Sequence, residues 1–295
     1  MTDAREAVDR IAAATGAERG HRTLHAKGRF YQGSFTASPE AAALCRAGHL
    51  QGEPVPVLVR WSNGSGHPRN RDDAQDVRGM AVKLTLPDGS ATDLLGQTAP
   101  YFPVRTPEDF VRLVEATRQP WRLPLFLATR PGTAAALLGN ARARATRAPR
   151  SYAEATYYPV HAYRWLAPDG ARRWVRYRLE PVAAEAGRPD GQFAGRDRLA
   201  EEAVARLARG PAVFDLRVTL AGPGDDPDDP MAVWTGEREL SAGRLEVTAP
   251  VLDPEAGGSV VVFDPTRVVD GIELSADPIL RFRPAAYSVS VDRRV

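Results

Sequence analysis

A histidine near the start of the chain and a tyrosine near its end are the residues best suited to chemistry. His25 lies in the segment Arg-Thr-Leu-His-Ala-Lys-Gly, residues 22–28, and Tyr287 follows Arg283 by four positions. An imidazole with an ordinary pKa of about 6.5 can accept and donate a proton near neutrality. Residues four apart share one face of a helix, so the Arg283 guanidinium can reach the phenol oxygen and favour its ionised form. The pair predicts a proton-transfer group and an anionic oxygen ligand.

Composition limits the class of protein without defining its chemistry. A chain of 295 residues with 43% hydrophobic content can form one large domain, or two at most. Its formal net charge of +2 gives no reason to expect a nucleic-acid partner. The only cysteine, Cys45, excludes an internal disulfide and a cysteine-rich metal site. The first residues lack the apolar core of a signal peptide, and no run of about 18 apolar residues occurs, so we expect a cytoplasmic protein without a membrane association.

Local patterns predict a mixture of strands and capped helices that position these residues. An amphipathic pattern over residues 3–15 predicts an exposed lead-in helix. Ser38 and Thr106, each followed by proline, are typical helix caps. Further helices are expected near 132–147 and 197–208, and strands at 24–35, 55–61, 79–86, 160–166, 173–181 and 212–220.

Three further segments lie between the two reactive motifs. They are Val59-Arg-Trp-Ser-Asn, Asp76-Val-Arg-Gly-Met-Ala-Val-Lys and Asp93-Leu-Leu-Gly-Gln-Thr-Ala-Pro-Tyr-Phe. Taken in this order, the five segments resemble the haem-dependent catalase family, in its minimal, catalase-related peroxidase type. The resemblance implies an α+β fold: an antiparallel β-barrel catalase-like core with peripheral helices, over residues 20–295 after a lead-in helix in 1–19. It also implies haem b as cofactor.

The resemblance assigns one group of residues to the distal face of the haem. There His25 would move a proton between the two oxygens of a bound peroxide, and Ser62 would hydrogen-bond its ring. Gln97 stands where catalases carry an asparagine that contacts the peroxide, so the amide is set back by one methylene. Phe102 and Phe110 match aromatic residues that shape the cavity and exclude water.

A second group matches the proximal face. By resemblance, the Tyr287 phenolate ligates the haem iron, and Arg283 is tied to His161 and Asp277 in a relay that favours the anion. Haem propionates require cations, and guanidinium groups bind carboxylates at two points. The arginines that match this role are Arg22, Arg60 and Arg294.

The predicted activity is that of a haem peroxidase, an oxidoreductase in which a small organic electron donor reduces hydrogen peroxide or an organic hydroperoxide. The departure at Gln97, and the absence of the long terminal segments of full-length catalases, favour this activity over oxygen release. Three alternatives stay open: true catalase activity, a biosynthetic haem enzyme for dehydration or rearrangement, and a non-catalytic haem carrier or sensor. The sequence names neither the donor nor the number of subunits, and a homo-oligomer is left open.

Overall fold

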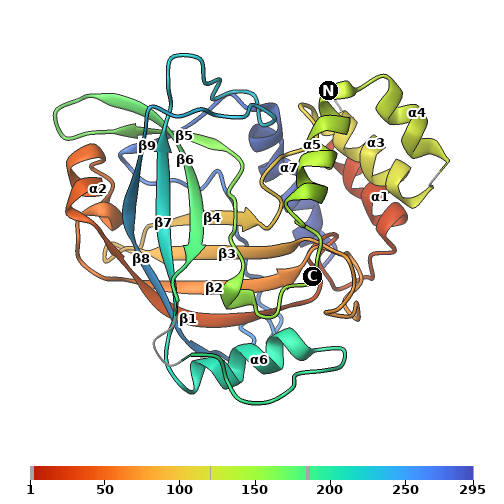
Figure 1. Ribbon diagram of the computed structural model, residues 1–295, viewed down its shortest axis with the longest axis horizontal. Coiled ribbons are helices and arrows are strands. Elements are labelled where there is room, and N and C mark those ends of the chain that lie inside the picture. The colour runs from red at the N-terminus through yellow and green to blue at the C-terminus, as the bar shows by residue number, and fades with distance from the viewer. Residues whose placement is uncertain (1–2, 120, 184–186, 295) are drawn as a thin grey trace.

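The computed structural model describes residues 3–119, 121–183 and 187–294, and its centre is one antiparallel sheet. Within these residues, nine strands follow the order β4-β3-β2-β1-β8-β7-β6-β5-β9. The strands are β1 (Gly28–Ala37), β2 (Val55–Asn63), β3 (Arg78–Thr85), β4 (Ala91–Gln97), β5 (Ala162–Leu166), β6 (Arg172–Pro181), β7 (Ala212–Leu220), β8 (Arg238–Pro250) and β9 (Ile272–Leu274). Figure 1 shows β1–β4 running across the direction of β6–β8, so the sheet curls into an open barrel.

The core fills the inside of this curl. In β7, buried residues alternate with half-buried ones, as expected for a strand that presents one face to the interior. Trp61, Trp165, Tyr157 and Phe214 are fully buried and belong to the largest apolar cluster. Burial of each such side chain contributes about 1.5–3 kcal/mol. The curled sheet is therefore a rigid frame on which side chains can be held.

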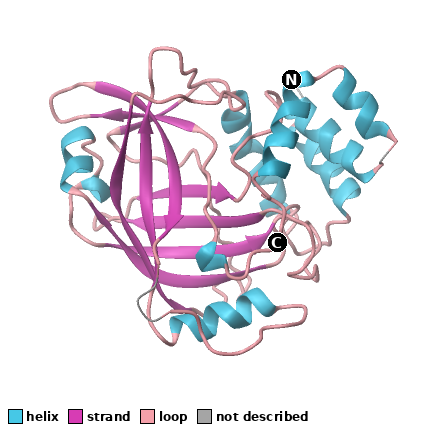
Figure 2. Cartoon of the chain, viewed as in Figure 1, coloured by secondary structure: helices cyan, strands magenta, loops and turns pink. Residues whose placement is uncertain are grey.

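The described residues also form seven α-helices. They are α1 (Ala4–Thr15), α2 (Pro39–Leu44), α3 (Pro107–Arg118), α4 (Arg122–Ala128), α5 (Pro131–Arg142), α6 (Arg198–Leu207) and α7 (Pro278–Asp292). Figure 2 shows α1, α3, α4, α5 and α7 gathered beside one end of the sheet, while α2 and α6 lie apart from them. None of the described helices is both long and apolar enough to cross a membrane.

Helix α1 differs from the exposed lead-in that its sequence predicted. Ala7, Val8 and Ile11 are buried, and a small apolar cluster joins α1 to Val111 of α3. Arg10 forms a two-point hydrogen bond with Glu115 of α3, at 2.8 and 2.9 Å. An amphipathic helix needs a surface to cover its apolar stripe, and α3 and α7 supply it. The division of the chain at residue 20 stays a prediction.

The predicted α+β class is confirmed, and most predicted elements are present with shifted ends. The strand over 212–220 has the predicted bounds, and Ser38 and Thr106 cap α2 and α3 through their side-chain oxygens. The strand expected at 24–35 begins only at Gly28, so His25 precedes it in irregular backbone. Strands β4, β8 and β9 and helix α4 were not predicted.

Candidate functional site

The reactive residues predicted from the two ends of the chain face one cavity of about 450 Å³. Residues from α1, β2, β3, β4, α3 and α7 line it. Ten of the twelve predicted site residues are among them, namely His25, Ser62, Gln97, Arg22, Arg60, Phe102, Phe110, Arg283, Tyr287 and Arg294. The other two, His161 and Asp277, are buried beside it and do not belong to the lining among the described residues.

Strand register assembles the wall around His25. Ser62 of β2 lies opposite Gly79 of β3, and Gly79 in turn lies opposite Gln97 of β4. Side chains at directly paired positions point to the same face of a sheet. The register therefore places the Ser62 hydroxyl and the Gln97 amide on one cavity-facing row, with no side chain between them at Gly79.

The His25 ring lies over this row. Its backbone adopts a φ of 55°, a left-handed conformation uncommon for a residue with a side chain, and its N–H donates to the Gly64 carbonyl at 3.0 Å. The ring nitrogen Nδ1 is 3.0 Å from Ser62 Oγ, which leaves Nε2 for proton transfer. A Cβ at Gly79 would lie 2.6 Å from this Nδ1, so only glycine leaves room for the ring. This role of Gly79 could not be recognised from the sequence, because it depends on the contact between β3 and the His25 ring.

The His25 imidazole is held in its neutral form. Burial, followed by the charges of Arg60 and Arg283, lowers its pKa to about 3. His25 is partly exposed as a residue, and it lines the cavity. A neutral imidazole offers a free ring nitrogen as a proton acceptor at physiological pH.

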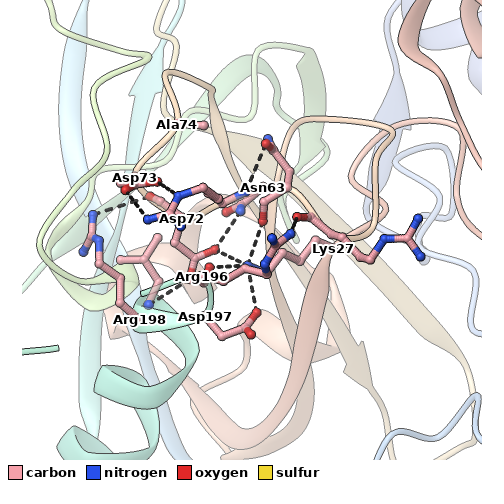
Figure 3. Close-up of polar contacts among 12 residues, drawn as sticks. Lys27, Asn63, Asp72, Asp73, Ala74, Arg196, Asp197 and Arg198 are labelled. Atoms are coloured by element: carbon pink, nitrogen blue, oxygen red, sulfur yellow. Dashed lines mark hydrogen bonds and ion pairs between the residues drawn. The ribbon is translucent and has the colours of Figure 1, made fainter. Parts of the chain in front are cut away.

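A polar network joins Lys27, Asn63 and the buried Asp72, as Figure 3 shows. Lys27, two residues after His25, donates to Asp72 Oδ1 at 2.7 Å. The same carboxylate oxygen accepts from Asn63 Nδ2 at 2.8 Å, and Asn63 accepts from the Tyr152 hydroxyl at 2.8 Å. Asn63 directly follows Ser62. The network therefore anchors the segments that carry both distal residues.

Helix α7 carries the opposite wall. Arg283 donates to the Tyr287 hydroxyl oxygen at 3.0 Å, as the spacing of four residues predicts. Asp277 caps the helix, because its Oδ1 accepts from the N–H groups of Ile279 and Leu280 at 2.8 and 3.3 Å. Its other oxygen is 2.6 Å from His161 Nδ1. Asp277 therefore has a second role, in positioning α7, that the sequence analysis did not assign.

Of the relay predicted around Arg283, two hydrogen-bonded pairs are formed, Arg283 with Tyr287 and His161 with Asp277, but the predicted link from Arg283 to the other pair is not. Burial, followed by the Arg283 charge, lowers the pKa of His161 to about 4, although Asp277 opposes this shift. The buried His161 Nε2 has no hydrogen-bond partner within the residues that the structure describes. The two pairs are thus electrostatic neighbours, and a direct hydrogen bond between His161 and Arg283 is not formed.

The Asp277 cap gives a first testable prediction. Asp277→Ala should lower the free energy of unfolding by about 2 kcal/mol or more, because it removes the cap and leaves His161 without its buried partner. Asp277→Asn should cost less, because an amide oxygen can still cap the helix. Urea denaturation of both variants measures the difference. Equal losses would contradict a capping role.

Three arginines line the same cavity. Arg22 and Arg294 each donate to Glu255, while the buried Arg60 donates to the Ala26 carbonyl at 3.2 Å. Arg60 Nε has no partner among the described residues, and burial lowers the pKa of this guanidinium to about 9. Buried cations with unused donors favour an anionic ligand.

Aromatic side chains complete the lining. Phe102 and Phe110 stack with ring centroids 5.9 Å apart and an interplanar angle of 12°. Phe102 also contacts the His161 ring, with centroids 6.4 Å apart. A flat apolar group with carboxylates at its edge fits this cavity: aromatic walls beside it, a phenol for a metal on one face and guanidinium groups for the carboxylates. A haem has these properties.

Two contributions to the cavity were not recognised in the sequence. Val8 and Ile11 of α1 line it, and Glu255 bridges two of its arginines. The amphipathic pattern of residues 3–15 indicated a buried face but not its partner. Glu255 lies in a loop without a pattern, so the sequence carried no signal for it.

Comparison with known sequences gives consistent results. The profile of the family described as Catalase matches residues 5–188. A catalase-related peroxidase of Mycolicibacterium paratuberculosis is 48% identical over 293 residues, which is 98% of this chain and 94% of that protein. A catalase-related peroxidase of Synechococcus elongatus is 30% identical, over 95% of this chain and 85% of that protein.

Solved structures show the same fold. A bacterial catalase superimposes with a TM-score of 0.80 at 20% identity, and a fungal catalase with 0.79 at 21%. Each match covers 98% of this chain, but only 60% and 62% of the catalase chains, so the protein spans the part of a catalase that holds the curled sheet. As its motifs predicted, the chain belongs to the catalase family, and it is of the short type represented by the catalase-related peroxidases.

Proposed function

We propose that the protein is a haem b peroxidase that reduces hydrogen peroxide or organic hydroperoxides with a small organic electron donor. The observation that carries this proposal is the placement of His25 and of the Arg283–Tyr287 pair on the lining of one cavity. Family membership implies a haem, and the relatives named catalase-related peroxidases support the activity. A cytoplasmic location belongs to the same proposal, supported by the single, free Cys45.

The residues that would hold the haem are already in place. Tyr287 would ligate the iron, with Arg283 stabilising its phenolate, and Arg22, Arg60 and Arg294 would bind the propionates. When bound, a ferric haem supplies a centre that peroxide can oxidise by two equivalents.

His25 would manage the protons of the peroxide. Its neutral ring could take up a proton from one oxygen of a bound peroxide at Nε2 and return it to the other oxygen. Ser62 keeps the ring in orientation through Nδ1, and the stacked Phe102 and Phe110 would help to exclude water from the cavity that they line.

Gln97 supports peroxidase over catalase activity. Within the residues that the structure describes, its side-chain amide has no hydrogen-bond partner, although its backbone pairs with Tyr158. Release of oxygen requires a second hydrogen peroxide in one orientation, which a loosely held amide secures poorly. An organic donor can give electrons at the haem edge and does not need this contact. Measuring oxygen release and donor oxidation together separates the peroxidase from the catalase alternative, and both from the biosynthetic and carrier alternatives.

Oxidation of phenolic or aromatic amine donors should be readily measured in the haem-loaded protein, with oxygen release well below that of a full-length catalase. Gln97→Asn should shift the ratio towards oxygen release, because the shorter side chain restores the family's amide position. An oxygen electrode and a donor assay on the same sample give the ratio. Vigorous oxygen release from the unmodified protein would favour the catalase alternative, and no peroxide chemistry at all would favour a biosynthetic enzyme or a carrier.

A further inference from the structure

In the loop after β8, the carboxylate of Glu255 points inwards. Residues 252–259 are exposed apart from Glu255, whose side chain is 19% exposed. The side chain crosses to two arginines from opposite ends of the chain, Arg22 before β1 and Arg294 after α7. One carboxylate therefore ties three distant segments together at the edge of the cavity.

The contacts use both carboxylate oxygens. Oε2 accepts from Arg22 at 2.6 Å, and Oε1 accepts from Arg22 at 2.9 Å and from Arg294 at 3.0 Å. The Val261 N–H also donates to Oε1 at 2.9 Å, and the Val261 carbonyl accepts from Arg22 at 2.9 Å. This two-point geometry fixes the plane of the Arg22 guanidinium.

Electrostatics explains why a bridge is needed here. Burial and the Arg22 charge lower the pKa of Arg294, whereas Glu255 raises it. Burial also raises the pKa of the Glu255 carboxyl, but the hydrogen bond and charge of Arg22 outweigh this effect, and the pKa lies below its usual value. Without the carboxylate, two like charges would lie side by side and would move apart towards solvent.

Glu255 holds the arginines from outside the cavity. Arg22, Arg60 and Arg294 line the cavity, and Glu255 is not among the described residues that do. Each arginine has five N–H donors, so donors remain for a ligand inside. Three guanidinium groups and one carboxylate carry a net charge of +2. This charge would balance the −2 of two ionised propionates.

We propose that Glu255 is the positioning residue that holds Arg22 and Arg294 in the orientation in which they bind the propionates. This inference rests on the proposed function, because it assumes that haem enters the cavity. In this proposal the Glu255 carboxylate helps to retain the haem, whereas Tyr287 ligates its iron.

The test is the rate at which haem b leaves the protein for an excess of apomyoglobin. Glu255→Ala should release haem about ten-fold faster or more, as is usual when the residue orienting a ligand-binding group is lost. Glu255→Gln, which keeps the volume and one acceptor but not the charge, should be intermediate. The visible spectrum should stay that of the unmodified protein, because the Tyr287–Arg283 pair is not changed.

Asp253→Asn is the matched control. Asp253 lies in the same loop and accepts from the Glu255 N–H at 2.9 Å, but it makes no contact with either arginine. An asparagine side chain can also accept this hydrogen bond and keep the turn. The rate of haem release from Asp253→Asn should therefore stay near that of the unmodified protein. Equal acceleration in this control would show that loop order, not the Glu255 charge, retains the haem, and would overturn the inference.

Two other results are decisive. Unchanged haem release in both Glu255 variants would mean that the carboxylate has no role in retention, and slower release would mean that it competes with the propionates. Either result would overturn the inference and leave the proposed function intact. An unmodified protein that takes up no haem would contradict the proposed function and the inference with it.

Discussion

Tyr287→Phe is expected to lose haem, or to bind it with a changed ligand field, because the phenol oxygen is the only atom of this side chain that can ligate iron. Arg283, 3.0 Å from that oxygen, would then lose this hydrogen-bond partner. We expect the unmodified protein to purify with, or take up, a ferric high-spin haem whose spectrum indicates phenolate ligation. Absorption and electron paramagnetic resonance spectra of both proteins measure the change.

Tyr158→Phe is the matched control for this substitution. Tyr158 also lines the cavity, but it lies across from Gln97 and not on α7. Its loss of a hydroxyl should leave the spectrum unchanged. A Tyr287→Phe protein with the spectrum of the unmodified protein would sink the assignment of the axial ligand.

His25→Ala should leave haem bound and slow the reaction with peroxide by about 10²- to 10⁴-fold, the usual effect of losing a positioned acid–base group. The ring is the group next to Ser62 that can accept a proton, and its lowered pKa keeps it neutral, with a free ring nitrogen. The rate constant of the first spectral change after mixing with hydrogen peroxide measures the effect.

The exposed His21, in the same segment, provides the control. His21→Ala should react at the rate of the unmodified protein. Ser62→Ala should slow the reaction less than His25→Ala, because the Gly64 carbonyl still holds the His25 backbone. Equal rates in His25→Ala and the unmodified protein would show that the distal motif is a remnant of ancestry without a role in the reaction.

Local signals in the sequence were sufficient for much of the fold. The caps at Ser38 and Thr106 and the strand over 212–220 depend on residues a few positions apart, and the structure has them. The spacing of Arg283 and Tyr287 likewise predicted a contact within one helical turn, and it is formed. Motif order then supplied the family, and with it the curled sheet.

Features that depend on distant segments could not be predicted. The pairing of β8 with β7 shifts between Ser241 and Gly243, and the alternation of buried and exposed residues along β8 changes phase there, which interrupts its period of two. Helix α4 has no buried residue to give it a periodic face. The bridge from Glu255 to Arg22 and Arg294 joins positions 233 and 39 residues apart. Tertiary packing alone brings these groups together.

Activation of peroxide in this cavity for the oxidation of an organic donor can be followed by double mixing in a stopped-flow spectrometer. The ferric haem-loaded protein is mixed first with hydrogen peroxide and then with an aromatic amine. We expect a rapid spectral change on the first mixing, and a return to the starting spectrum with oxidised donor on the second. A spectrum that does not respond to peroxide, or one that returns with vigorous oxygen release before the donor is added, would contradict it.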